Sequence, residues 1–214
     1  MDSPAVPSLI VPLPSPARGE SARVRVGNAE LVLEHARGAH ALVWSDGRQV
    51  RRFVLGLGSQ GQLAVALRAP RLPVQVVPRE AITIVPGARV RGYVLVPLVP
   101  TLVWQRGDQQ RALFELVPDG LRALWDEDVG HVHRTNSTWM SRFPHRSDEP
   151  RAVVPVRLAN TGDEPVCPAH LLLRVHDADL RPLRGAFVLP PQRLLWRDRA
   201  FTSVLPPAKM EPIA

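Results

Sequence analysis

The chain has 214 residues, 45% hydrophobic and 22% charged, so it is long enough to bury a substantial core as a soluble globular protein. Its 23 prolines exclude an architecture of long helices, because proline interrupts helix interiors and central strand positions. The net charge of +7 does not predict a nucleic-acid site, because all basic residues except Lys209 are arginines spread along the chain without a basic run. We attribute the charge to a general bias in composition and expect no nucleic-acid partner.

Short apolar segments with a period of two follow a proline-rich tail at residues 1–19. In 21–26, three apolar residues alternate with polar ones, which is typical of a strand with one buried face. Comparable segments recur at 29–35, 39–44, 49–55, 62–68, 72–78, 81–86, 88–97, 101–105 and 109–118. The pair Asp46-Gly47 is a hairpin signal between two of them. Residues 117–128 are the best candidate for a short helix of one or two turns.

A glycine-rich segment, GLGSQG at residues 56–61, has the spacing of a dinucleotide-binding loop. Such a loop leaves a buried strand and opens a helix whose N-terminal amides face the phosphates. Here the next segment soon reaches Pro70, and Leu63, Val65 and Leu67 alternate as they would in a strand. We therefore predict a hairpin connection and not a nucleotide site.

The segment 151–175 has the clearest strand–corner–strand pattern in the chain. An apolar row precedes the turn at 160–163, and a second row follows it. The two rows are Val154, Val156 and Leu158, then Cys167, Ala169, Leu171, Leu173 and Val175. The pattern predicts two adjacent sandwich strands with Cys167 buried, and it resembles the corner common to immunoglobulin-like domains. A buried thiol lacks the electropositive setting of a nucleophile, and no G-x-S-x-G elbow is present, so we lean against an enzyme.

A second resemblance rests on three stretches in order: TIVPGARVRGYVLVPLVPTLVW, then LRALWDEDVGHVHR, then the 151–166 corner. Together they are similar to a prokaryotic family known only as domain of unknown function 432, over residues of about 80–170. The resemblance implies an all-β fold and no assigned activity. It also implies a link to membrane channels, because some members are associated with mechanosensitive channels.

Residues 125–146 hold the strongest candidate for metal chemistry. On a strand, His131 and His133 project from the same face at a spacing that lets two imidazoles bind one divalent metal ion, with Asp128 as a third ligand. Other candidate ligands nearby are Asp126 and His145. The cupin pattern also begins with H-x-H, but residues 136–138 lack its glutamate. The same two histidines are also typical of a surface or an interface.

The expected compartment is the cytoplasm. Cys167 is the only cysteine, which gives no internal disulfide framework. The first residues lack the basic start of a signal peptide, and the longest apolar run, 93–104, contains two prolines and is too short to span a bilayer.

These observations predict an all-β protein of two packed β-sandwich-like, immunoglobulin-like units with at most short helical turns. The expected units are 20–118 and 119–206, between the tail 1–19 and a loose C-terminus at 207–214. We expect a non-catalytic binding, regulatory or assembly protein that contacts a protein partner or a second copy of itself. The interface candidates are Trp125, Trp139, His131, His133, Arg134 and Arg142. The alternative is a metal-binding module or metal-dependent enzyme that uses the two histidines.

Overall fold

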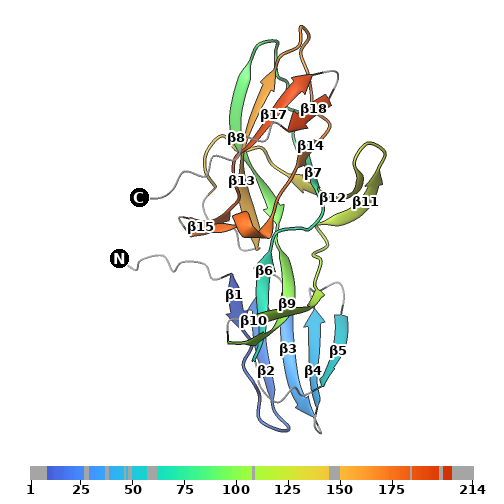
Figure 1. The fold of residues 1–214 in the computed structure, drawn as a ribbon, viewed down its shortest axis with the longest axis vertical. Coiled ribbons are helices and arrows are strands. Elements are labelled where there is room, and N and C mark those ends of the chain that lie inside the picture. The colour runs from blue at the N-terminus through green and yellow to red at the C-terminus, as the bar shows by residue number, and fades with distance from the viewer. Residues whose placement is uncertain are drawn as a thin grey trace.

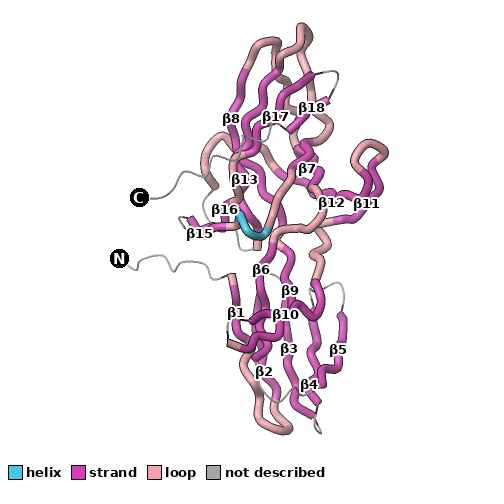
Figure 2. The backbone as a smooth tube through the Cα atoms, viewed as in Figure 1, coloured by secondary structure: helices cyan, strands magenta, loops and turns pink. Residues whose placement is uncertain are grey.

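The structure is a computed structural model, and it confirms the all-β prediction. It describes residues 9–203 except 27–28, 37–38, 46, 48–49, 57–61, 108, 145–149, 184 and 198–199. Within that part of the chain the one helical element is a single 3-10 turn, Asp177–Asp179. Figure 1 shows two β lobes stacked along the long axis, and Figure 2 places the helical turn where the lobes meet. Of the expected tails, residues 1–8 and 207–214 lie outside the described residues, whereas the rest of the 1–19 tail contains the strand Ile10–Pro12 and the buried Leu13.

The lower lobe of Figure 1 contains two four-stranded sheets. Sheet I has the order β2-β3-β4-β5 and is antiparallel throughout. Its strands are β2 (Ser21–Val26), β3 (Ala29–Ala36), β4 (Ala39–Ser45) and β5 (Val50–Gly56). Sheet II has the order β1-β6-β9-β10. Its strands are β1 (Ile10–Pro12), β6 (Gln62–Arg68), β9 (Val99–Arg106) and β10 (Gln109–Glu115).

The upper lobe contains sheets III and IV. Sheet III has the order β11-β12-β7-β14, with β7 (Val74–Pro78), β11 (Arg122–Asp126), β12 (Gly130–Ser137) and β14 (Leu171–Leu173). Sheet IV is built around β13, which pairs with β8, β16 and β17. Its strands are β8 (Arg89–Pro97), β13 (Arg151–Asn160), β15 (Arg181–Leu183), β16 (Ala186–Val188), β17 (Gln192–Arg197) and β18 (Ala200–Ser203).

Strand alternation places the core as the sequence predicts in sheet I. Leu31 and Leu33 of β3, and Leu42 and Trp44 of β4, are buried, whereas the arginines of β2 are exposed. Apolar side chains on one face of a strand are removed from water together, which is the main favourable term of this packing. At the far end of the sheet, Phe53 stacks on Phe114 of β10 and joins sheet I to sheet II.

The glycine-rich segment is not a hairpin, which corrects the prediction. β5 belongs to sheet I and β6 to sheet II, so residues 57–61 connect two sheets. Residues 57–61 themselves lie outside the described part of the chain, as do Asp46 and His145. The segment that follows is the strand β6 and not a helix. A dinucleotide loop requires a helix there, so the nucleotide reading has no structural support.

The 151–175 corner differs from the prediction in its partners. β13 and β14 lie in different sheets, so the corner passes the chain from one layer to another. The predicted turn at 160–163 is present, and buried Asn160 holds it: its Nδ2 donates to the carbonyls of Ile84 and Glu164, and its Oδ1 accepts from the Gly162 amide. These three bonds satisfy backbone groups that the corner would otherwise leave unpaired.

Two further expectations fail at individual segments. Cys167 and Ala169 are exposed, because the isolated bridge between Ile84 and Val166 turns Val166 inward, whereas Leu171, Leu173 and Val175 are buried as predicted. Residues 122–126 form the strand β11 and not a short helix, because they pair with β12.

The two lobes are joined by three chain crossings, between β6 and β7, β8 and β9, and β10 and β11. Leu98, Leu116 and Leu121 in these crossings are fully buried, and one hydrophobic cluster extends through both lobes. The division into independent units 20–118 and 119–206 stays a prediction. The sheets cross that boundary, because β7 and β8 pair with strands that follow residue 118.

The first testable prediction concerns Gly92, which lies in β8 under the ring of Trp139. A Cβ atom at Gly92 would lie 2.3 Å from Trp139 Cε2, so Gly92→Ala forces the indole out of its place. We expect a loss of about 1–3 kcal/mol in the free energy of unfolding, measured by urea denaturation. The matched control is Gly120→Ala, whose added Cβ would meet its nearest atom at an ordinary 3.9 Å. Equal stabilities of the two variants would contradict this packing.

Candidate functional site

The β11–β12 hairpin carries the most exposed aromatic residue among the described large hydrophobic side chains. It projects from one side of the upper lobe in Figure 1. Trp125 is 67% exposed, and its ring meets His131 edge-on, with 4.9 Å between the ring centroids. Gly130, at φ +86°, lies beneath the same ring, and a Cβ atom added to it would lie 3.9 Å from Cη2 and Cζ3 of Trp125. The indole is therefore supported on one side by its own hairpin and open to solvent on the other.

Polar contacts hold the hairpin in shape. Asp126 Oδ1 accepts the backbone amides of Asp128 and Val129, at 3.0 and 3.1 Å, and so closes the turn. Its other carboxylate oxygen accepts a hydrogen bond from the side-chain amide of Gln75 in β7. The carbonyl oxygen of that buried amide accepts from Arg134 Nε and Nη2, at 3.2 and 3.1 Å. Charge-assisted bonds of this kind are roughly twice as strong as neutral ones, so they fix the hairpin to β7.

The tip of the hairpin is acidic, although the chain as a whole is strongly basic. Asp126, Glu127 and Asp128 follow Trp125 directly, and Glu127 and Asp128 are exposed. The hairpin therefore combines an exposed aromatic ring with a local excess of negative charge, and both are held by the same turn.

The other predicted interface residues lie away from this exposed ring. Trp139 is half-buried, packs against the core and covers Gly92. Arg142 is exposed on the segment that follows. Arg134 is held by Gln75 at the base of the hairpin.

The two predicted metal-binding histidines lie in different surroundings. His131 is exposed and packs against Trp125, whereas His133 is half-buried at the junction of the lobes. Asp128 lies in the turn, where its amide bonds to Asp126. The described residues contain no group of three or more His, Cys, Asp or Glu side chains placed to hold a metal ion.

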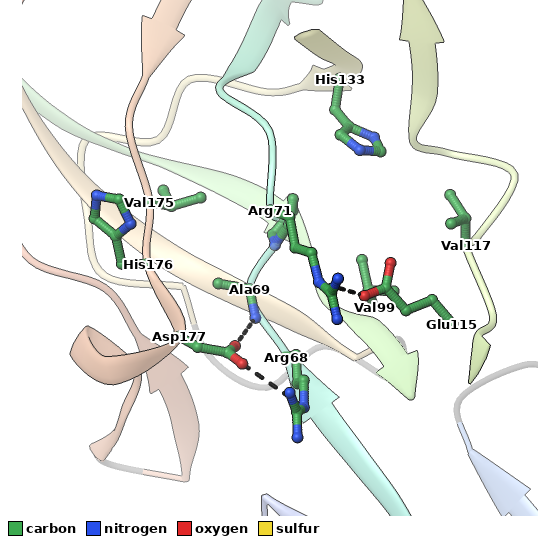
Figure 3. A pocket seen from close by; sticks show the side chains of 11 residues that line it. Arg68, Ala69, Arg71, Val99, Glu115, Val117, His133, Val175, His176 and Asp177 are labelled. Carbon is green, nitrogen blue, oxygen red and sulfur yellow. Dashed lines mark hydrogen bonds and ion pairs between the residues drawn. The ribbon is translucent and has the colours of Figure 1, made fainter. Parts of the chain in front are cut away.

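A cavity of about 210 Å³ lies where the lobes meet, and the sequence reasoning missed it (Figure 3). Arg71 Nε contacts Glu115 Oε1 at 2.6 Å across it. On the other side, Asp177 Oδ1 accepts the amide of Ala69 at 2.6 Å, and Asp177 Oδ2 lies 3.7 Å from Arg68 Nε. These contacts connect β6 and β10 of the lower lobe to the chain that enters the upper lobe. Their spacing in sequence, of up to 108 residues, left no local signal from which to predict them.

His133 faces this cavity from the upper lobe in Figure 3. Its buried Nδ1 has no hydrogen-bond partner among the described residues. Burial lowers the pKa of His133 below its ordinary value, and the neighbouring Glu115 carboxylate opposes that change. The cavity is therefore lined by two cation–carboxylate pairs, whose charges balance, and by two imidazoles, His133 and His176, of which His133 favours the neutral form.

Comparison with protein families gives one match, over residues 14–181, to a family described as "Protein of unknown function (DUF432)". The chain belongs to this family. The membership confirms the resemblance found in the sequence, and it extends the matched region towards both termini. No curated protein and no solved structure matches the chain. In the described part of the chain, no helix has the length and apolar character needed to cross a bilayer.

The second testable prediction follows from His133. Because its pKa in the folded state lies below the unfolded value, the unfolded chain takes up the proton first as the pH falls. The free energy of unfolding should therefore decrease between about pH 8 and about pH 5, and His133→Gln should decrease less over the same range. Urea unfolding at both pH values measures the difference, with exposed His170→Gln as control. The same decrease in His133→Gln and wild type would contradict the assignment.

Proposed function

We propose that this DUF432 protein is a non-catalytic binding or assembly protein whose contact element is the β11–β12 hairpin. The observation that supports the proposal is the exposure of Trp125, 67%, on a hairpin that holds it rigidly. An exposed tryptophan raises the free energy of the free protein, because contact between apolar surface and water is unfavourable. A partner that covers the ring removes that cost.

The geometry of the hairpin also limits the conformational entropy that the Trp125 side chain would lose on binding. The ring rests on Gly130 and His131, and the turn beneath it is closed by Asp126. A side chain that is already held in place loses less freedom when it binds, and buried tryptophans are common among the residues that dominate binding energy. The acidic tip beside the ring supports a partner with a basic, partly apolar surface.

The family resemblance makes a membrane-channel protein one partner to test. The single cysteine supports the cytoplasm as the compartment, because a disulfide framework is the usual device of secreted domains.

The third testable prediction is that Trp125→Ala weakens partner binding without unfolding the chain. Trp125 is largely exposed, so the free energy of unfolding should change by less than about 1 kcal/mol. Binding to itself or to a candidate channel protein should weaken by about thirtyfold, the effect of an interface hot spot. Sedimentation measures self-association and calorimetry measures the mixed complex. Leu183→Ala, a 50% exposed leucine of the other sheet in the upper lobe, is the control. A complex that forms equally well with Trp125→Ala contradicts the proposal.

The metal-binding alternative stays a proposal with one observation in its favour. His133 Nδ1 is buried, lacks a partner among the described residues and belongs to an imidazole that favours the neutral form, the form that ligates metal. Elemental analysis of the purified protein tests it. A divalent metal bound near one per chain, and lost in His131→Ala and His133→Ala, would establish the site. A substoichiometric content that is the same in all three proteins would exclude it.

A further inference from the structure

The last strand of sheet I presents a second apolar surface. Val50 and Val54 of β5 are 70% and 74% exposed, the highest values among the described large hydrophobic residues. Between them, Arg52 points to the same face, because side chains two residues apart share a face of a strand. β5 pairs only with β4 among the described strands, so it forms an edge of the sheet. Long edge strands with exposed valines are unusual in monomers unless something covers them.

The outer face of sheet I continues this surface with an excess of arginine. Registered pairs place Val43 beside Arg52 and Val32 beside Val43, so half-buried valines extend the apolar strip across β4 and β3. Charged side chains flank the strip. They are Arg23, Arg25 and Arg52, against Glu30 and Glu34. Glu34 pairs with Arg52 at 2.9 Å, and Glu30 lies 3.7 Å from Arg23, which leaves three arginines for two glutamates.

We call β5 together with the valine strip beside it the β5 surface. The β5 surface complements the hairpin, because both expose apolar groups and their charges are opposite in sign. The hairpin offers an exposed ring and carboxylates, and the β5 surface offers exposed valines and guanidinium groups. Both lie on the same side of the elongated molecule, one in each lobe (Figure 1, right-hand side). A second copy turned by 180° therefore brings its hairpin to β5 of the first copy and its β5 to the hairpin of the first.

We infer that two copies of this chain form a two-fold dimer in which the Trp125 hairpin of each copy docks on the β5 surface of the other. This inference rests on the proposed function, which is binding through the β11–β12 hairpin, and it identifies the partner as a second copy of the chain. Each contact places Trp125 and the carboxylate of Glu127 against Val54 and the guanidinium of Arg52. A closed two-fold arrangement makes this contact twice and covers both exposed surfaces at once.

The experiment uses the full chain and a charge exchange. Glu127→Arg puts arginine against Arg52 in both contacts of its homodimer, and Arg52→Glu puts glutamate against Glu127 in both. An equimolar mixture of the two variants pairs opposite charges at both contacts. Sedimentation at low salt over a concentration series should therefore show that each variant alone has a Kd raised at least about fivefold, and that the mixture regains the wild-type Kd. Asp163→Arg mixed with Arg174→Glu, two exposed sites in the upper lobe, is the control and should not differ from its separate variants.

The apolar part of the contact is tested by Val54→Glu against Val85→Glu, a valine 55% exposed in the upper lobe. We expect Val54→Glu to be a folded monomer by circular dichroism and sedimentation, and Val85→Glu to dimerise as the wild type does. A wild type that stays monomeric, a Val54→Glu variant that dimerises normally, or a mixture that does not recover would each overturn the inference. If another protein still binds through Trp125 in that case, the proposed function stands; if no complex depends on Trp125, both fail.

Discussion

The antiparallel ladder between β8 and β13 is the constraint on which the rest of the structure depends. It pairs nine residues in register, from Arg89 with Ala159 to Pro97 with Arg151. Because β8 precedes β9 and β10 in sequence but lies in the other lobe, the chain must cross the junction three times. The ladder joins a strand that precedes residue 118 to one that follows it, so residues 20–118 alone would leave β8 without its partner, and unpaired buried backbone groups are costly. The crossings that this pairing imposes carry buried leucines, and one hydrophobic cluster extends through both lobes.

Local periodicity made the strands predictable, but it did not reveal their partners. Alternation along β2, β3 and β4 marks a buried face whatever strand lies alongside, so those segments were read correctly. The partners of β5 and β6 depend on contacts distant in sequence, and the glycine-rich segment between them was misread as a hairpin. Cys167 shows the same limit, because either Val166 or Cys167 could face the core by local pattern alone. The bridge between Ile84 and Val166 turns Val166 inward and exposes the thiol.

The candidate site was predictable residue by residue and unpredictable as an arrangement. Trp125 and His131 stood out in the sequence, and the structure brings their rings together. Gln75 did not stand out, because a single glutamine among the valines of a strand is expected to point to solvent. It is in fact 1% exposed and bonds to Asp126 and Arg134, more than fifty residues away. Buried polar groups need partners, and these partners come from the fold and not from the neighbouring sequence.

The junction decides how far apart the two exposed apolar surfaces lie on one copy. The hairpin is fixed to the upper lobe through Gln75, and β5 is fixed to the lower lobe through β4. The spacing between them therefore depends on the lobe angle, which the buried leucines and the Arg71–Glu115 and Asp177–Ala69 contacts determine. A two-fold pair requires the same spacing in both copies, so a rigid junction lowers the entropy that such a contact loses. The packing between the lobes therefore also determines the geometry of the contact that we propose between two copies.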